Sequence, residues 1–198
     1  MNIKKYFFAA ACMVLLFFAL NAAVFCGVAN AAAGDKGKRV LVVYYSYSKD
    51  GNTRKVARRI HELAGGDIVE IKPVKPYQGA YDEVVRQAQE ENAVDYRAPI
   101  STKVSDIRSY DVVFVGTPVW WFKMAPPVRS FLASHDLRGK EVVPFCTHGG
   151  YGGGEVAAET AKLATGAKVL KGIAVDCKDS GNPVGDVPAW LREIGVVK

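Results

Sequence analysis

Residues 39–63 read RVLVVYYSYSKDGNTRKVARRIHEL, and this stretch decides the fold. The apolar run at 40–45, rich in β-branched and aromatic residues, is typical of a strand that is buried on both faces. Residues 46–53 are polar, and apolar residues then recur at helical spacing from Val56 to Ala64, with basic residues between them. The stretch therefore predicts a strand, a hydroxyl-rich loop and an amphipathic helix.

The loop between this strand and this helix has the features of an anion site. Ser46, Ser48 and Thr53 carry hydroxyl donors, and Gly51 allows the backbone to approach a ligand closely. The first turn of the helix adds free backbone N–H groups and the positive end of the helix dipole. Two interpretations stay open here: a bound phosphate, or an ordinary strand-to-helix connection with Thr53 as the N-cap.

The composition is that of a globular protein with a mild positive charge. The 198 residues are 49% hydrophobic and 23% charged, and the formal net charge is +6. Lys4 and Lys5 belong to an N-terminal segment without acidic residues, and without them 24 basic residues face 20 acidic ones, a net charge of +4. No Lys/Arg run is long enough to indicate a nucleic-acid partner, so we expect none.

The first 33 residues resemble an export signal. Lys4 and Lys5 precede an almost wholly apolar run at 6–20, and small residues at 29–33 have the spacing of a cleavage site. We expect cleavage near Ala31 or Ala33 and export of residues 38–198, as one domain, to the periplasm or the extracellular space. The alternative is an uncleaved signal that anchors the protein in a membrane through residues 6–28.

Strands and helices alternate along the rest of the chain. Further strands are expected at 67–71, 112–115, 142–146 and 168–175, and further helices at 81–94, from 126 onward, at 155–164 and at 187–194. This alternation predicts an α/β fold with a parallel sheet and helices on both faces. Five strands fit the doubly wound order 2-1-3-4-5.

In that order, ligands bind beyond the carboxyl ends of the strands, where the winding reverses. Three unusual loops lie at those ends, at 46–53, 116–124 and 147–154. The second loop contains adjacent Trp120 and Trp121, which cannot easily both enter the core, so one of them is free to stack on a planar ring. Phosphate donors at one end and flat aromatic surfaces at the other predict a ligand such as flavin mononucleotide, FMN. The alternatives are tryptophans packed beneath the following helix and glycines in a flexible surface loop.

Other kinds of site do not fit the spacing of the residues. The glycines at 149–154 lack the Gly-Lys-Ser/Thr ending of a P-loop, and Gly152 stands where a thiolate phosphatase would need an arginine after Cys146. The acidic residues of a phosphoacceptor domain are missing after the first strands. The three histidines are scattered, and no His/Cys/Asp cluster has the spacing of metal ligands, so no metal is expected.

From Val40 to the end of the fifth expected strand, the chain resembles the flavodoxin-like FMN-binding family. The resemblance is carried by SYSKDGNT at 46–53, GTPVWW at 116–121 and FLASHDLRGKEVVPFCTHGGYGGG at 131–154. It implies FMN as the cofactor, with its phosphate held by Ser46, Ser48, Gly51, Asn52 and Thr53. It also implies a flavin ring lined on one side by Thr117, Pro118, Trp120 and Trp121, and on the other by Thr147, His148, Gly149, Gly150 and Tyr151.

The chain departs from this family in two respects. Lys49 and Asp50 add two residues to the usual spacing between the second hydroxyl and the glycine, and Lys49 would add a positive charge near the phosphate. The mild positive charge of the chain also differs from the acidic surface of typical flavodoxins, which indicates a different partner.

The resemblance implies redox chemistry that the cofactor supplies and the protein tunes. The leading interpretation is an exported electron-transfer flavoprotein that works with a redox partner protein or a small-molecule electron acceptor. The alternatives are an NAD(P)H-dependent quinone or flavin oxidoreductase, and a flavin-free binding module on the same fold. Cys146 and Cys177 end neighbouring strands in the expected order, where they form either a disulfide or two buried thiols.

Overall fold

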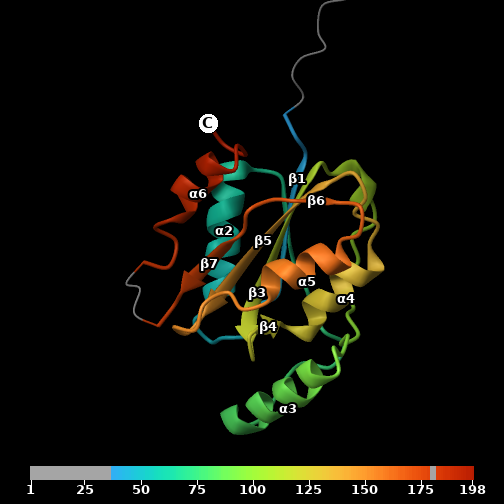
Figure 1. The fold of residues 1–198 in the computed structure, drawn as a ribbon, viewed down its shortest axis with the longest axis vertical. Coiled ribbons are helices and arrows are strands. Elements are labelled where there is room, and N and C mark those ends of the chain that lie inside the picture. The colour runs from blue at the N-terminus through green and yellow to red at the C-terminus, as the bar shows by residue number, and fades with distance from the viewer. Residues whose placement is uncertain (1–36, 179–181) are drawn as a thin grey trace, which may run out of the picture. The chain divides into compact units, whose positions relative to one another are not determined.

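The computed structural model describes residues 37–178 and 182–198. Its first strand, β1 (Val40–Tyr44), is buried at every position and pairs in parallel with β2 (Asp67–Glu70) and β3 (Val112–Trp120). The strand β5 (Glu141–His148) pairs with the other side of β3, and β6 (Lys168–Val169) pairs with β5. The order β2-β1-β3-β5-β6 confirms the doubly wound parallel sheet that the sequence predicts (Figure 1).

The fifth expected strand, 168–175, is divided into β6 and β7 (Ile173–Asp176), and both parts pair with β5. Val142 pairs with Val169 whereas Phe145 pairs with Ile173, so one extra residue is accommodated opposite β5, as in a β-bulge. Pro144 lies within this interval and has no N–H to donate to the ladder. The extra residue and the missing donor together explain the break in the strand.

A short strand that the sequence did not predict, β4 (Lys123–Met124), folds back antiparallel onto the end of β3. The two residues of the connecting turn, Trp121 and Phe122, have positive φ angles of 49° and 63°. Two-residue turns of this kind normally contain Asn and Gly, which tolerate positive φ. We call residues 119–124 the aromatic hairpin. Its turn is built from two aromatic side chains and therefore carries no recognisable turn signal.

Helices cover both faces of the sheet, as expected. On one face lie α2 (Asn52–Ala64) and α6 (Val187–Glu193), and on the other lie α4 (Pro126–Ser134) and α5 (Val156–Leu163) (Figure 1). Leu41 of β1 packs in one core with Phe131 of α4, and the next residue, Val42, packs in the other core with Ile60 of α2. Because consecutive side chains enter opposite cores, β1 is apolar throughout.

The helix α3 (Tyr81–Ala93) lies beyond the ends of β3 and β4 rather than over a face of the sheet (Figure 1). Its buried side chains include Val84 and Ala88. The indole Nε1 of Trp121 donates a hydrogen bond of 3.0 Å to the Val85 carbonyl oxygen. The helix is thus fastened to the aromatic hairpin, at the edge of the sheet where the sequence predicts a ligand.

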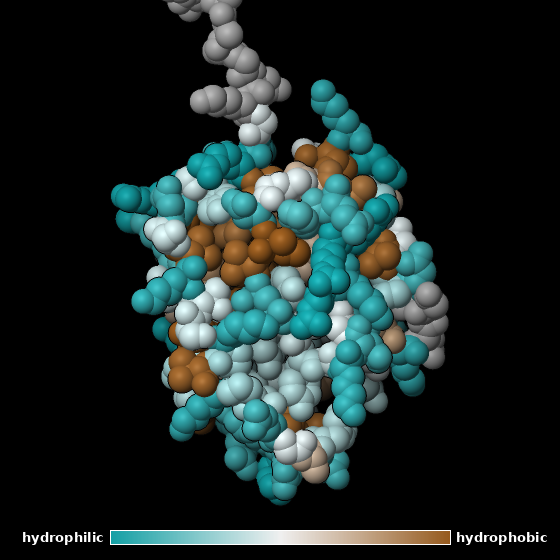
Figure 2. Space-filling view, turned by 180° about the vertical axis from the view of Figure 1, so that it is seen from behind, coloured by the Kyte–Doolittle hydropathy of each residue, from teal (hydrophilic) through white to brown (hydrophobic). Residues whose placement is uncertain are grey.

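Figure 2 shows the face opposite to that of Figure 1, where hydrophilic side chains surround a hydrophobic area in the upper half. Among the described residues, no helix is long and apolar enough to cross a membrane. The expected export signal at 1–33 and the alternative anchor at 6–28 lie outside the described residues.

Candidate functional site

The first loop, 46–53, leads into α2 through Gly51, which is the N-cap residue with a φ of 63° and no side-chain cap. The simpler interpretation, with Thr53 as the N-cap, is therefore wrong. Ser48 Oγ accepts a hydrogen bond of 3.2 Å from the Asn52 N–H. Thr53 Oγ1 lies 2.8 Å from Thr147 Oγ1 at the end of β5, a buried hydroxyl pair that joins the first loop to the third.

The hydroxyl of Ser46 is the best indication of an anion-binding site in this loop. Ser46 Oγ is buried and has no hydrogen-bond partner among the described residues. Leaving such a group unpaired costs about 1–3 kcal/mol, so a partner from outside the chain would stabilise the site. A phosphate oxygen fits, because it accepts hydrogen bonds and is favoured at a helix N-terminus. We call residues 46–53 together with Thr147 the phosphate end.

The basic side chain nearest the start of α2, Arg54, has a partner outside the phosphate end. Arg54 forms an ion pair of 2.8 Å with Glu70, and this partner raises the pKa of the Arg54 guanidinium. Lys49 is exposed on the loop. That it adds a positive charge near a bound phosphate stays a prediction. Hydroxyl and backbone groups are therefore the main candidates for holding an anion at the phosphate end.

The two tryptophans of the second loop have different surroundings, which confirms that they do not both enter the core. Trp120 is half-buried and packs edge-on against Tyr45, Tyr47 and Tyr77, with ring centroids 5.9, 5.4 and 4.9 Å away. Trp121 is 46% exposed. Trp120 thereby brings the aromatic hairpin into contact with the first loop, while Trp121 presents a partly exposed ring.

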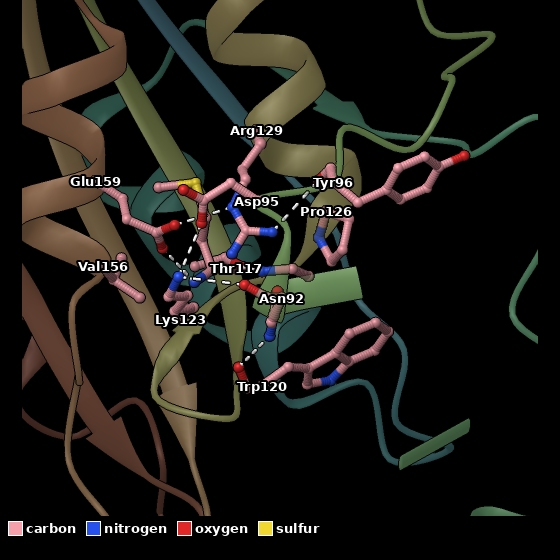
Figure 3. Close-up of polar contacts among 12 residues, drawn as sticks. Asn92, Asp95, Tyr96, Thr117, Trp120, Lys123, Pro126, Arg129, Val156 and Glu159 are labelled. Atoms are coloured by element: carbon pink, nitrogen blue, oxygen red, sulfur yellow. Dashed lines mark hydrogen bonds and ion pairs between the residues drawn. The ribbon is translucent and has the colours of Figure 1, made fainter. Parts of the chain in front are cut away.

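A buried ionic network supports the aromatic hairpin (Figure 3). Arg129 of α4 is 2% exposed, and its Nε donates a hydrogen bond of 2.9 Å to Glu159 Oε1 of α5. Glu159 Oε2 accepts a hydrogen bond of 2.7 Å from the Met124 N–H. From α3, Asn92 Nδ2 donates a hydrogen bond of 2.6 Å to the Trp120 carbonyl oxygen. Three helices thus fix the two strands of the hairpin.

Thr117 and Pro118 also act on the hairpin. Thr117 is 1% exposed, and its Oγ1 accepts a hydrogen bond of 2.9 Å from the Ala125 N–H and donates one of 2.9 Å to the Pro118 carbonyl oxygen. The hydroxyl of Thr117 is therefore occupied in bracing the hairpin from within.

The hairpin has a further contact at its second strand. Lys123 Nζ donates a hydrogen bond of 2.8 Å to Asp95 Oδ1, which lowers the pKa of the Asp95 carboxyl.

The glycine-rich third loop, 147–154, is folded around one side chain. His148 Nδ1 accepts hydrogen bonds of 3.2 Å from the N–H groups of Gly150 and Gly152. The loop is also locked onto the hairpin, because the Phe122 carbonyl oxygen accepts a hydrogen bond of 2.6 Å from the Glu155 N–H. A Cβ on Gly154 would lie 2.0 Å from that oxygen. The loop thus makes specific contacts with its own histidine and with the hairpin.

Between the hairpin, the third loop and α3 lies a cavity of about 480 Å³. Five of the residues that were predicted to contact a planar ring line this cavity: Trp120, Trp121, His148, Gly149 and Tyr151. Thr117, Pro118, Thr147 and Gly150 are not among its lining residues. Among the described residues, no Asp, Glu, Lys or Arg lines the cavity. We call it the ring end of the site.

Sequence reasoning missed several residues of the ring end. Tyr47 lies in the first loop and Phe122 in the second, but neither was selected. The missed residues of α3 are Tyr81, Val84, Val85 and Ala88. An amphipathic helix pattern indicates that one side of α3 is buried without indicating what it covers, so only the fold places these residues at the cavity.

Cys146 and Cys177 are free thiols, so the disulfide alternative is wrong. Of the two thiols that were expected to be buried, Cys146 is buried and Cys177 is half-buried. Cys146 pairs with Ala174, and Cys177 lies three residues beyond it. Three strand residues span about 10 Å, whereas a disulfide needs Cα atoms about 4.4–6.8 Å apart. Burial raises the pKa of the Cys146 thiol to about 12. This thiol is therefore not a thiolate nucleophile at neutral pH.

Known proteins of similar sequence or structure share this architecture. The flavodoxin family profile matches residues 39–191. A structure from Bacteroides eggerthii, provisionally classed as a flavoprotein, is 31% identical with a TM-score of 0.70, covering 82% of this chain and 100% of that one. A flavoprotein from Lactobacillus acidophilus, solved in complex with FMN, is 23% identical with a TM-score of 0.63, covering 78% and 99%. The latter similarity concerns the fold alone.

Two curated relatives bear the name NAD(P)H dehydrogenase (quinone). The protein from Paraburkholderia phymatum is 32% identical over 94 residues, which are 48% of this chain and 45% of that protein. The protein from Azorhizobium caulinodans is 33% identical over 96 residues, with the same shares. The chain thus spans about half the length of the curated relatives it matches.

Proposed function

Starting from the fact that the chain belongs to the flavodoxin family, we propose that it is an FMN-dependent electron-transfer flavoprotein that reduces a small planar acceptor such as a quinone. Family membership and the FMN complex of the Lactobacillus acidophilus flavoprotein support FMN as the cofactor. The two relatives named NAD(P)H dehydrogenase (quinone) support a quinone-like acceptor and NAD(P)H as the electron donor.

One observation carries this proposal: an unpaired buried hydroxyl and an uncharged aromatic cavity lie at the same edge of the sheet. Ser46 Oγ lacks a partner among the described residues at the phosphate end. Trp120 and Tyr47, which follows Ser46, pack together and line the ring end. FMN has the same division, with an anionic phosphate at one end and a flat heterocycle at the other.

Each end of the site has its own task in this function. Ser46, Ser48 and the first N–H groups of α2 would bind and orient the phosphate. Trp121 and Tyr151 would cover the ring and exclude water from it. When bound, FMN supplies one- or two-electron transfer. The protein's contribution is to orient the ring and to leave one edge open to an acceptor.

The rings at the mouth of the cavity favour a flat acceptor. Trp121, Phe122 and Tyr151 are 46%, 53% and 80% exposed. Exposed aromatic faces bind planar molecules by stacking. The same exposed rings also suit contact with a redox protein, since aromatic residues are enriched at protein interfaces. Electron transfer to a protein partner is therefore the second candidate function.

Two assays on the purified full chain test these candidates. Titration with FMN should quench flavin fluorescence and give a yellow protein, and NAD(P)H oxidation should then depend on added quinone. A reducible flavin without quinone-dependent oxidation would support the protein partner instead. A colourless protein that cannot be reconstituted with FMN would refute both candidates and leave the flavin-free binding module.

We also propose that residues 1–33 direct export and are removed. The support comes from the basic start, the apolar run and the small residues at 29–33. Fractionation of the producing cells and the intact mass of the recovered chain provide the test. A periplasmic or secreted chain lacking about 31–33 residues is expected. Full-length protein in the membrane fraction would instead establish the anchor.

A further inference from the structure

The imidazole of His148 makes a pattern of contacts that fixes its protonation state. Its Nδ1 accepts hydrogen bonds of 3.2 Å from two backbone N–H groups, those of Gly150 and Gly152. A backbone N–H can only donate, so Nδ1 carries no proton in this arrangement. The neutral ring must therefore hold its proton on Nε2.

His148 is also a residue of the ring end. His148 lines the cavity, and no described residue accepts a hydrogen bond from its Nε2. The remaining lining residues include no Asp, Glu, Lys or Arg. His148 is thus the one histidine among the lining residues of the described chain.

The glycine loop depends on this ring for its shape. Gly150 and Gly152 have positive φ angles of 96° and 78°, a conformation that brings their N–H groups toward a single acceptor. A second proton on the ring would sit on Nδ1 and point at these two N–H groups. The hydrogen bonds would be lost, and like dipoles would face one another. The loop must then open.

We propose that His148 is a positioning residue with two roles: its Nδ1 pins the glycine loop, and its Nε2–H donates a hydrogen bond to a carbonyl oxygen or ring nitrogen of the ligand. The ligand contact rests on the proposed function, whereas the loop contacts do not. We call the two hydrogen bonds that Nδ1 accepts the pin. Nδ1 can accept them only in the neutral ring, so protonation of His148 in acid releases the glycine loop and weakens ligand binding.

Among the described residues, two charged side chains, Asp176 and Lys178, lie near Gly150 of the glycine loop. Asp176 of β7 is the register partner of His148, and a Cβ on Gly150 would lie 3.5 Å from Cδ of Lys178. These two groups have opposite charges. On the cavity side, the first loop contributes Tyr47 and α3 contributes Tyr81. The effect of protonation that the described contacts show is the loss of the two hydrogen bonds to Nδ1.

Two substitutions separate the roles. In His148→Asn, the amide oxygen takes the place of Nδ1 as an acceptor, but the Nε2–H donor is lost. In His148→Gln, the amide nitrogen reaches toward the place of Nε2, but the acceptor at Nδ1 is lost. Neither side chain titrates. His61→Gln is the matched control, since His61 lies on α2 and contacts the Gly66 carbonyl oxygen.

NMR of the FMN-free protein tests the pin directly. The imidazole nitrogen spectrum at about pH 8 should show the Nε2–H tautomer. The amide signals of Gly150 and Gly152 should shift on acidification with the same midpoint as the His148 ring. In His148→Asn they should not respond to acid, and in His148→Gln they should resemble the acidified wild type. An Nδ1–H tautomer, or an unchanged acid response in His148→Asn, would overturn the pin.

FMN titration tests the consequence for the ligand. Loss of two hydrogen bonds should weaken FMN binding about tenfold between about pH 8 and about pH 5 in the wild type and in His61→Gln. His148→Asn should lose this pH dependence and bind uniformly more weakly than the wild type at about pH 8. Equal pH dependence in all three proteins would refute the coupling. If no protein binds FMN at any pH, the proposed function fails, and the NMR result still decides the pin.

Discussion

The phosphate end and the ring end of the site are held together in different ways. At the phosphate end, the chain relaxes into an allowed turn at Gly51, and short hydroxyl side chains such as those of Ser48 and Thr53 make the contacts. At the ring end, Trp121 and Phe122 adopt positive φ angles that bulky residues avoid. The phosphate end combines an unstrained local turn with one long-range hydroxyl contact, whereas the ring end keeps a strained turn through contacts from three helices.

The strained turn at Trp121 and Phe122 must be stabilised by the residues around it. A strained turn persists only when its surroundings over-determine it. Here the surroundings are the Arg129–Glu159 pair behind the hairpin and the hydrogen bond from the Glu155 N–H to the Phe122 carbonyl oxygen in front of it. Removing either support should damage the ring end more than the phosphate end.

The largest effect is expected for Arg129→Met. This change leaves the Glu159 carboxylate, which is 12% exposed, without its buried cation, while the Met124 N–H still donates to it. Breaking a buried pair in this way should lower the free energy of unfolding by about 4 kcal/mol, measured by urea denaturation. Arg58→Met, at an exposed position of α2, is the matched control and should change it by less than about 0.5 kcal/mol.

The double variant Arg129→Met with Glu159→Leu sharpens this test. It removes both charges, so a large part of the lost stability should return. Equal destabilisation by the single and the double variant would show that the packing of Arg129 matters and its charge does not.

The next largest effect is expected for Gly154→Ala. The new Cβ would lie 2.0 Å from the Phe122 carbonyl oxygen, and the φ of Gly154 is +55°. The clash and the left-handed conformation together should lower the free energy of unfolding by about 3 kcal/mol. Gly149→Ala is the control in the same loop, because its Cβ would meet nothing within 4 Å. Similar melting temperatures for the two variants would show that the loop and the hairpin are not interlocked.

The same difference explains how much the sequence can predict. The phosphate end follows from the sequence because a strand, a polar loop and a helix are contiguous, and the topology rule then brings 116–124 and 147–154 to the same edge. The ring end cannot be predicted in the same way, because the residues that support it are distant in sequence. Arg129 reads as the polar residue of an amphipathic helix, and its burial depends on Glu159, which is 30 residues away. The break between β6 and β7 likewise depends on Pro144 in the neighbouring strand.

At the phosphate end, Thr53→Val should have a moderate effect. Valine keeps the shape of threonine but removes the hydroxyl that pairs with Thr147 Oγ1 at 2.8 Å. Leaving the buried Thr147 hydroxyl unpaired and removing a candidate phosphate donor should weaken FMN binding about tenfold. Thr53→Ser restores the hydroxyl and should bind FMN within about twofold of the wild type. If Thr53→Val binds as the wild type does, the hydroxyl pair has no part in holding the ligand.

The smallest effect has the opposite sign and is expected for Phe122→Gly. A left-handed φ costs a bulky residue about 1–2 kcal/mol, and glycine removes this strain but adds about 0.5–1 kcal/mol of backbone entropy to the unfolded chain. The variant also loses the edge-on contact of Phe122 with Tyr151, whose ring centroids are 6.4 Å apart. We therefore expect a net gain in the free energy of unfolding of about 0.5 kcal/mol. Quinone reduction should fall at the same time, because the exposed ring that the strain maintains is gone.

Phe122→Asn separates the relief of strain from the entropy of glycine, since asparagine tolerates positive φ without that entropy. If both variants are less stable than the wild type, the turn is not strained, and the ring end is as relaxed as the phosphate end.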